Sequence, residues 1–250
     1  MPKVFLSPSN QFANRYAAGN TNEGKQMGIV ANLLKVALER CGIQVMLMHD
    51  QTMAEKCKTA NNWGADLYIP IHSNACNDQV GGTRLFCWSK PGKGYDACQA
   101  IFSFLAPITP GDSESIKVDQ TLYEIKYPYA PVAYVECDFH DVPSIAEWII
   151  THTADIAEAI CKGVCKYFGM SYVAPAHVET CTVTLPVLSL GSEGNSVVAL
   201  QRLLNGNGAK LAVDGDFGSK TLSAVKTLQK KKSIDIDGVV GKDTWGALLK

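Results

Sequence analysis

Residues 67–75 read Leu-Tyr-Ile-Pro-Ile-His-Ser-Asn-Ala, an apolar run of strand length that ends in one histidine and small polar residues. A second apolar run, residues 131–135, leads into Glu136 and then into a segment that contains His140. In open α/β sheets, ligands bind just outside the carboxyl ends of the strands. If the two runs are neighbouring strands, His72, Glu136 and His140 open onto one crevice. An imidazole beside a carboxylate base is the arrangement that metal-assisted hydrolysis requires.

Strand and helix patterns alternate along the chain around these two runs. The spacing of apolar residues predicts helices over residues 23–41, 53–63, 95–105 and 145–168. Further strands are expected over residues 3–6, 43–48 and 82–88, with a polar loop over 111–120 and a short strand or strand-like turn over 122–125. Such alternation predicts an α/β fold whose mainly parallel sheet has helices on both faces.

The composition changes after residue 170. Residues 171–187 contain proline, threonine and valine without a helical period, which is typical of a linker. The chain beyond contains a near-repeat, in which each Asp-Gly turn is followed by a threonine just inside a predicted helix: Asp214-Gly215 with Thr221, and Asp237-Gly238 with Thr244. We therefore predict a catalytic domain over 1–170, a linker over 171–187 and a small α-helical domain over 188–250.

The composition restricts the class of protein. Of the 250 residues, 46% are hydrophobic and 19% are charged, which indicates a globular chain. A net charge of −1 without a basic stripe argues against a nucleic-acid partner. No stretch approaches the length of a membrane span, and the first six residues resemble a strand rather than an apolar signal core. We expect synthesis in the cytoplasm without a signal peptide.

Nine cysteines are spread through the predicted helices and strands without a CxxC pair. This distribution argues against a zinc knuckle and against a secreted disulfide framework. Cys161 and Cys165 are one helical turn apart, the spacing of half a metal site. The simpler interpretation, which we favour, is that these thiols are small buried hydrophobic groups.

Several motifs together indicate a known family. They are residues 4–8 (Val-Phe-Leu-Ser-Pro), Glu23 at a helix start, residues 65–75, Gly81-Gly82-Thr83, residues 133–139 and, near the end of the chain, residues 190–194, 213–218 and 243–245. Residues 3–168 resemble the zinc-dependent N-acetylmuramoyl-L-alanine amidases, often called amidase family 3. Residues 188–250 resemble a peptidoglycan-binding domain with paired Asp-Gly motifs. The two resemblances together are more specific than either one.

The resemblance implies a zinc site. The family binds zinc through a histidine after the first strand, a glutamate at the start of the first helix and a histidine after a central strand. Glu23 and His72 match the last two of these ligands. The first histidine is missing, because this sequence has Asn10 at the corresponding position, and an amide oxygen is a poor zinc ligand beside an imidazole. We expect His140 to complete the site, with a hydrogen bond to the sheet edge or to substrate as the alternative role.

The resemblance also implies the reaction, cleavage of the amide bond between the lactyl group of N-acetylmuramic acid and the first L-alanine of the stem peptide. Glu136 is then the general base, and Asn10 and Asn74 are candidate substrate-binding residues. Bacterial peptidoglycan is the expected partner, reached after release as with phage endolysins.

Two alternatives are an inactive peptidoglycan-binding protein that has lost its metal, and a zinc peptidase that cuts within the stem peptide. Glu23 has the alternative role of a favourable carboxylate in the first turn of a helix.

Overall fold

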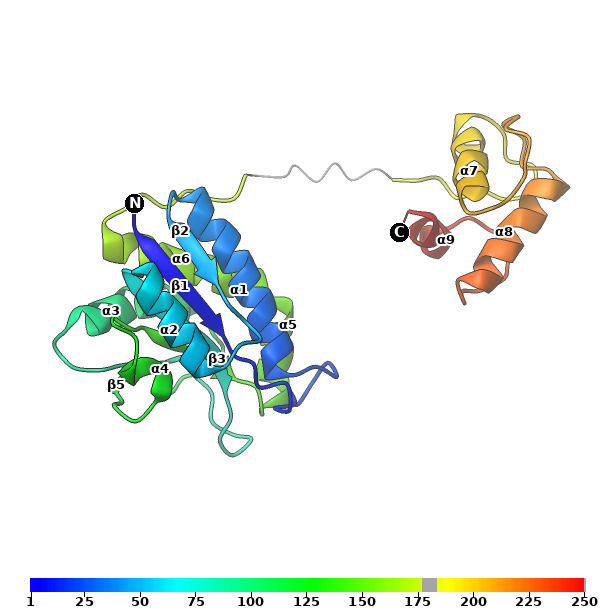
Figure 1. Cartoon of the computed structure of the whole chain (residues 1–250). Coiled ribbons are helices and arrows are strands. Elements are labelled where there is room, and N and C mark those ends of the chain that lie inside the picture. Colours follow the sequence, from blue (N-terminus) through cyan, green and yellow to red (C-terminus); the bar gives the residue numbers. More distant parts are fainter. Residues whose placement is uncertain (177–183, 250) are drawn as a thin grey trace. The chain divides into compact units, whose positions relative to one another are not determined.

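Six strands form one sheet in the order β2-β1-β3-β6-β4-β5 (Figure 1). Their bounds are β1 Lys3–Pro8, β2 Gln44–Leu47, β3 Leu67–Asn74, β4 Arg84–Cys87, β5 Ser115–Val118 and β6 Tyr134–Phe139. The four strands β2, β1, β3 and β6 are parallel neighbours, whereas β4 is antiparallel to β6 and parallel to β5. The prediction of a mainly parallel sheet is confirmed. The strands that carry His72 and Glu136 are neighbours, which is the condition under which the sequence predicts a shared site.

The structure is a computed structural model that describes residues 1–176 and 184–249. The chain divides into two compact units, Met1–His177 and Val178–Lys250. The sheet belongs to the first unit, together with the helices α1 Glu23–Arg40, α2 Met53–Trp63, α3 Lys93–Leu105, α4 Tyr123–Lys126, α5 Pro143–Thr151 and α6 Thr153–Phe168, and a 3₁₀ turn at Ala106–Ile108. None of the helices in the described part of the chain is long and apolar enough to span a membrane.

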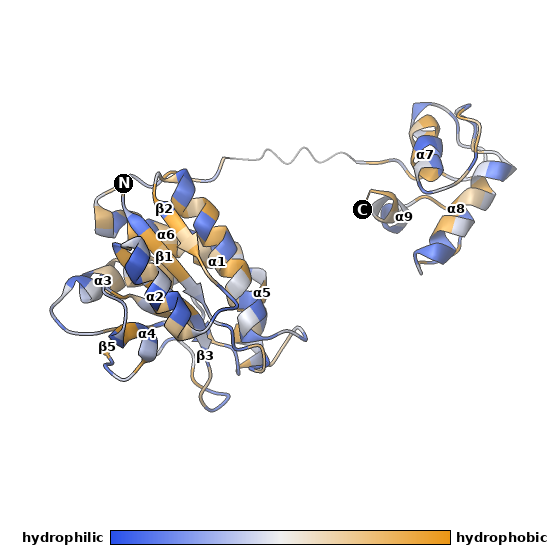
Figure 2. Ribbon diagram, viewed as in Figure 1, coloured by the Kyte–Doolittle hydropathy of each residue, from blue (hydrophilic) through white to orange (hydrophobic). Residues whose placement is uncertain are grey.

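Helices cover both faces of the sheet because side chains alternate along each strand. Val4, Leu6, Ile69 and Val135 point towards the apolar sides of α1, α3 and α6, while Phe5, Tyr68 and Tyr134 pack against α2 and α4. In Figure 2 apolar residues gather on the strands and polar ones on the outer sides of α1 and α2. The buried apolar side chains on both faces supply the main stabilisation of this unit.

Several predicted elements were wrong in detail. The helix expected over 145–168 is two helices, because His152 has φ −117° and ψ 25° and its backbone N–H bonds to the carbonyl of Trp148. Residues 122–125 lie in a helical turn, α4, since Asp119 accepts hydrogen bonds from the backbone of Thr121 and Leu122 and closes a turn before it. The predicted loop over 111–120 contains the edge strand β5, which is short and only half-buried.

The two strands that carry the predicted site residues are longer than expected. β3 continues to Asn74, and β6 begins at Tyr134 and continues to Phe139, so Glu136 lies inside a strand and does not follow one. Strand β6 extends because it has partners on both sides, β3 and β4. Tertiary pairing therefore lengthens a strand beyond the apolar run that predicted it.

Over its described residues, 184–249, the second unit contains three helices, α7 Asn195–Gly206, α8 Ser219–Lys231 and α9 Lys242–Leu248. The predicted near-repeat is a repeated hydrogen-bond clamp. The side-chain amide of Gln201 donates to Asp214 Oδ1 (2.7 Å) and accepts from the backbone N–H of Gly215 (3.0 Å). Gln229 makes the same two bonds to Asp237 and Gly238, at 2.8 and 2.9 Å. Each buried glutamine thus fixes one Asp-Gly turn against a helix.

The prediction of a linker over 171–187 concerns residues that the structure describes only in part, since 177–183 lie outside the described residues. The described parts, 171–176 and 184–187, contain neither helix nor strand.

Candidate active site

His72 and Glu136 occupy matching positions on the adjacent parallel strands β3 and β6. His72 is two residues from the carboxyl end of β3, and Glu136 is in the middle of β6. The His72 ring stacks on Tyr134, with ring centroids 4.8 Å apart. The imidazole is 7% exposed, so it is held in a nearly closed site and not on a free surface.

Glu23 is the first residue of α1, and its carboxylate meets the imidazole of His72. The backbone enters the helix through Asn22, whose side chain accepts from the backbone N–H of Lys25, so the helix start fixes Glu23. Glu23 Oε1 is 2.8 Å from His72 Nδ1, and Asn14 Nδ2 donates to Glu23 Oε2 at 2.9 Å. Burial alone raises the pKa of Glu23, but the hydrogen bond and charge of His72 and the Asn14 bond outweigh it and lower that pKa.

The pKa of His72 is raised, whereas that of Glu23 is lowered. Burial favours the neutral ring, but the hydrogen bond that His72 donates to Glu23 and the negative charges of Glu136, Glu23 and Glu124 raise the pKa of His72 overall. Three acids therefore face a single imidazole. This excess of negative charge favours a cation at the site.

Glu136 has a carboxylate oxygen, Oε2, that is fully buried without a hydrogen-bond partner, although the residue as a whole is partly exposed. Burial raises the pKa of Glu136 to about 8, the positive charge of His72 lowers it in part, and Glu23 raises it further. Such a carboxyl group can hold and release a proton near neutral pH, as a general base must. Its orphaned oxygen is available to a group that the polypeptide does not supply.

Sequence reasoning missed Glu124, which lies on α4 and is 4% exposed. Its Oε1 accepts hydrogen bonds from Tyr68 OH (2.6 Å) and from Ser7 Oγ, while its Oε2 is 4.0 Å from His72 Nε2. The signal was present in the sequence as a single acid between apolar and aromatic residues. It was missed because those residues were assigned to a short strand or turn.

In the long loop before α1, the side chain that lies next to His72 is that of Gln11 and not that of Asn10. The side-chain amide of Gln11 lies 3.4 Å from His72 Nδ1 and accepts a hydrogen bond from Asn14 Nδ2 at 2.8 Å. Asn10 Nδ2 instead donates to the backbone carbonyl of Gln51, and Asn10 is exposed. One network thus joins Gln11, Asn14, Glu23 and His72.

His140 and Asn74 lie beside this network. His140 Nδ1 is 3.0 Å from Ser73 Oγ, and its ring stacks on Tyr16 with centroids 4.8 Å apart. Burial lowers the pKa of His140. The side-chain oxygen of Asn74 accepts a hydrogen bond from the backbone N–H of Ala75. The backbone carbonyl of Asn74 accepts one from the backbone N–H of His140.

Among the described residues, one group of at least three His, Cys, Asp or Glu residues has ligand atoms that all lie within 4.8 Å of one another. That group is Cys41, Cys161 and Cys165. Glu23, His72 and His140 do not form such a group within the described chain. Of these three residues, only Glu23 and His72 have ligand atoms as close together as those of two ligands that share an ion. With the orphaned oxygen of Glu136 and the excess of acids, this pair fits a divalent cation.

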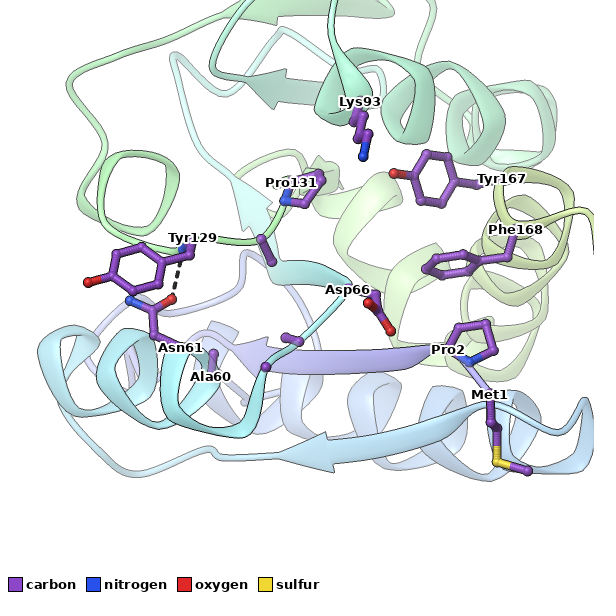
Figure 3. Close-up of a pocket in the computed structure, with 13 residues that line it drawn as sticks. Met1, Pro2, Ala60, Asn61, Asp66, Lys93, Tyr129, Pro131, Tyr167 and Phe168 are labelled. Atoms are coloured by element: carbon purple, nitrogen blue, oxygen red, sulfur yellow. Dashed lines mark hydrogen bonds between the residues drawn. The ribbon is translucent and has the colours of Figure 1, made fainter.

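A hollow of about 780 Å³ lies at the opposite end of the sheet (Figure 3). Pro2, Asp66 and Pro131, which precede β1, β3 and β6, line it together with Tyr129 and Tyr167. Because His72 and the three acids around it are absent from its lining, this hollow is not the candidate active site.

Comparison with known proteins gives two family matches. Residues 10–166 match the family described as N-acetylmuramoyl-L-alanine amidase, and residues 193–248 match the family described as a peptidoglycan binding domain. An uncharacterized 38.4 kDa protein of Clostridium perfringens is 31% identical over 111 residues, which are 43% of this chain and 32% of that protein. The N-acetylmuramoyl-L-alanine amidase CwlL of Bacillus licheniformis is 42% identical over 65 residues, which are 25% of this chain and 18% of CwlL.

The fold is shared with solved amidase structures. The catalytic domain of CwlV, an N-acetylmuramoyl-L-alanine amidase from Bacillus (Paenibacillus) polymyxa var. colistinus, aligns with a TM-score of 0.62 and 15% identity, over 68% of this chain and 100% of that chain. At that identity the likeness concerns the fold alone. The chain spans less than two fifths of the length of the first three curated relatives that it matches.

Proposed function

Because the chain belongs to the N-acetylmuramoyl-L-alanine amidase family, whose match covers residues 10–166, we propose that it hydrolyses the amide bond between N-acetylmuramic acid and L-alanine in peptidoglycan. The observation that carries the proposal is the pairing of Glu23 with His72 beside the unpartnered carboxylate oxygen of Glu136. These groups provide two ligands and one base from three adjoining elements, α1, β3 and β6.

Zinc is the proposed metal. When bound, it polarises a carbonyl and lowers the pKa of water. Glu23 and His72 are the proposed protein ligands, and the short distance between their ligand atoms supports this assignment. His140 remains the proposed third ligand. Ser73 engages its Nδ1, which leaves Nε2 for a metal, but the loop has to bring the ring closer to Glu23 and His72 than it lies here.

Glu136 is the proposed general base. Its raised pKa lets it take a proton from the attacking water and return one to the leaving nitrogen of L-alanine. Asn10 and Asn74 are proposed to bind substrate, since both lie at the carboxyl ends of the strands, where Asn10 is exposed. The network of Gln11 and Asn14 holds Glu23 and His72 in place.

The second unit is proposed to hold the enzyme on its polymeric substrate, because residues 193–248 match a peptidoglycan binding domain. Retention on the polymer raises the effective concentration of the first unit at the bonds that it cuts. We further propose that the protein acts on the cell wall after release from the cell in which it is made, as an endolysin does.

Digestion of purified peptidoglycan tests the reaction. The intact protein should expose new L-alanine amino termini, and Glu136→Gln should not. Glu147→Gln, a change of an exposed carboxylate on α5, is the matched control and should remain active. If neither the intact protein nor the control releases these termini while zinc is bound, the amidase proposal fails. Release of peptides that leave L-alanine on muramic acid would instead identify a peptidase.

A further inference from the structure

Three buried cysteines meet at the end of α1 that is remote from the candidate active site. Cys41 immediately follows α1, and Cys161 and Cys165 are one turn apart on α6. Because α1 contains 18 residues and a helix rises 1.5 Å per residue, this group lies about 27 Å along the helix from Glu23. The group is therefore separate from the site proposed for catalysis.

The distances between the three sulfurs are those of metal ligands. The Sγ atoms of Cys41 and Cys161 are 3.8 Å apart, and all three lie within 4.8 Å of one another. Zinc–sulfur bonds of about 2.3 Å at a tetrahedral angle place two sulfurs about 3.8 Å apart. A disulfide needs a separation of about 2.05 Å. The thiols are thus unbonded and spaced as they would be around one ion.

The backbone near residue 173 also supports negatively charged sulfur. The backbone N–H of Val173 donates to Cys41 Sγ at 3.3 Å, and hydrogen bonds of this kind stabilise a thiolate ligand. Arg40, whose guanidinium binds Glu158 at 2.7 Å, adds a positive charge that lowers the pKa of Cys165 in part. Burial is the larger effect and raises the pKa of Cys165 to about 11, so an ion has to displace protons from these thiols.

We propose that Cys41, Cys161 and Cys165 bind one thiophilic cation, zinc or a chemically similar ion, at a structural site distinct from the catalytic one. The backbone carbonyl of Val173, whose oxygen is 3.8 Å from Cys41 Sγ, or a water occupies the fourth position. The ion fastens the end of α1 to α6 and to the segment that follows α6. This proposal does not depend on the peptidoglycan reaction.

Cobalt tests the site directly, because cobalt bound to thiolates has an intense charge-transfer absorption that cobalt bound only to histidine and carboxylate lacks. The full-length protein is reduced, stripped of metal and titrated with Co²⁺. The intact protein should show the thiolate absorption and bind one more equivalent of metal than Cys161→Ser. Cys98→Ser, a change of a buried thiol on α3, is the matched control and should keep both signals.

Cys41→Ser is the second variant, since Cys41 lies at a helix end and is slightly exposed, and it should also lose the absorption. The proposal is overturned if the intact protein shows no thiolate absorption, or if the absorption persists in either variant. The same is true if the reduced, metal-free protein has the same unfolding temperature with and without added Cd²⁺.

Discussion

Replacing Glu136 by glutamine should stabilise the metal-free protein at neutral pH. The carboxyl group of Glu136 has a pKa of about 8 in the folded protein, against a reference value of 4.5, because burial disfavours its charged form. A group whose pKa is raised on folding binds more protons in the folded state, so stability decreases as the pH rises from about 4.5 to 8. Glutamine has nearly the same shape and carries no charge.

The shift in the pKa of Glu136 gives the size of the expected change in the free energy of unfolding. One unit corresponds to about 1.4 kcal/mol, so the proton that Glu136 has to bind on folding costs about 3 kcal/mol at pH 7 and almost nothing at pH 4.5. Because the residue is partly exposed, we expect a gain of about 2 kcal/mol at pH 7, or roughly 4–8 °C in the unfolding temperature of a unit of this size.

Calorimetry of the full-length protein in chelator, at pH 4.5 and pH 7, measures this gain. Glu147→Gln is the control for removal of an exposed carboxylate and should match the intact protein at both pH values. The reasoning is refuted if Glu136→Gln and the intact protein unfold at the same temperature at pH 7. It is also refuted if the gain is equally large at pH 4.5, since the effect would then not arise from charge.

Three other changes test the remaining interactions. Glu124→Ala should destabilise the protein by about 2–4 kcal/mol in urea unfolding, because the buried hydroxyl of Tyr68 loses its acceptor, whereas Glu124→Gln should retain most of the stability. His140→Ala should lower the zinc affinity measured by competition with a chelating dye, and unchanged affinity would limit His140 to packing on Tyr16. Gln201→Ala should destabilise the second unit by about 2 kcal/mol in thermal unfolding, because the Asp214-Gly215 turn loses its two hydrogen bonds to this side chain. The same change should weaken sedimentation with peptidoglycan. Unaltered unfolding would show that these hydrogen bonds contribute little.

The features predicted from the sequence are those that local patterns encode. Apolar runs and helical spacing predicted β3, α1, α2 and the parallel sheet, because burial on one or both faces imposes a period on the residues. The Asp-Gly turns of the second unit were also predictable, since a tight turn needs particular residues wherever it occurs. The four-residue helix α4 and the edge strand β5 were not, because elements this short have no period to detect.

The sequence by itself determined the two strands that carry His72 and Glu136, and hence the edge of the sheet at which the candidate site lies. Only the tertiary structure brought Glu124 to His72, since the two residues belong to segments 52 positions apart and meet through a turn without a sequence signature. It likewise brought Cys41 to the pair on α6, across 120 residues. The physical reason is that local patterns specify which face of an element is buried, whereas contacts between distant side chains depend on how the elements pack against one another.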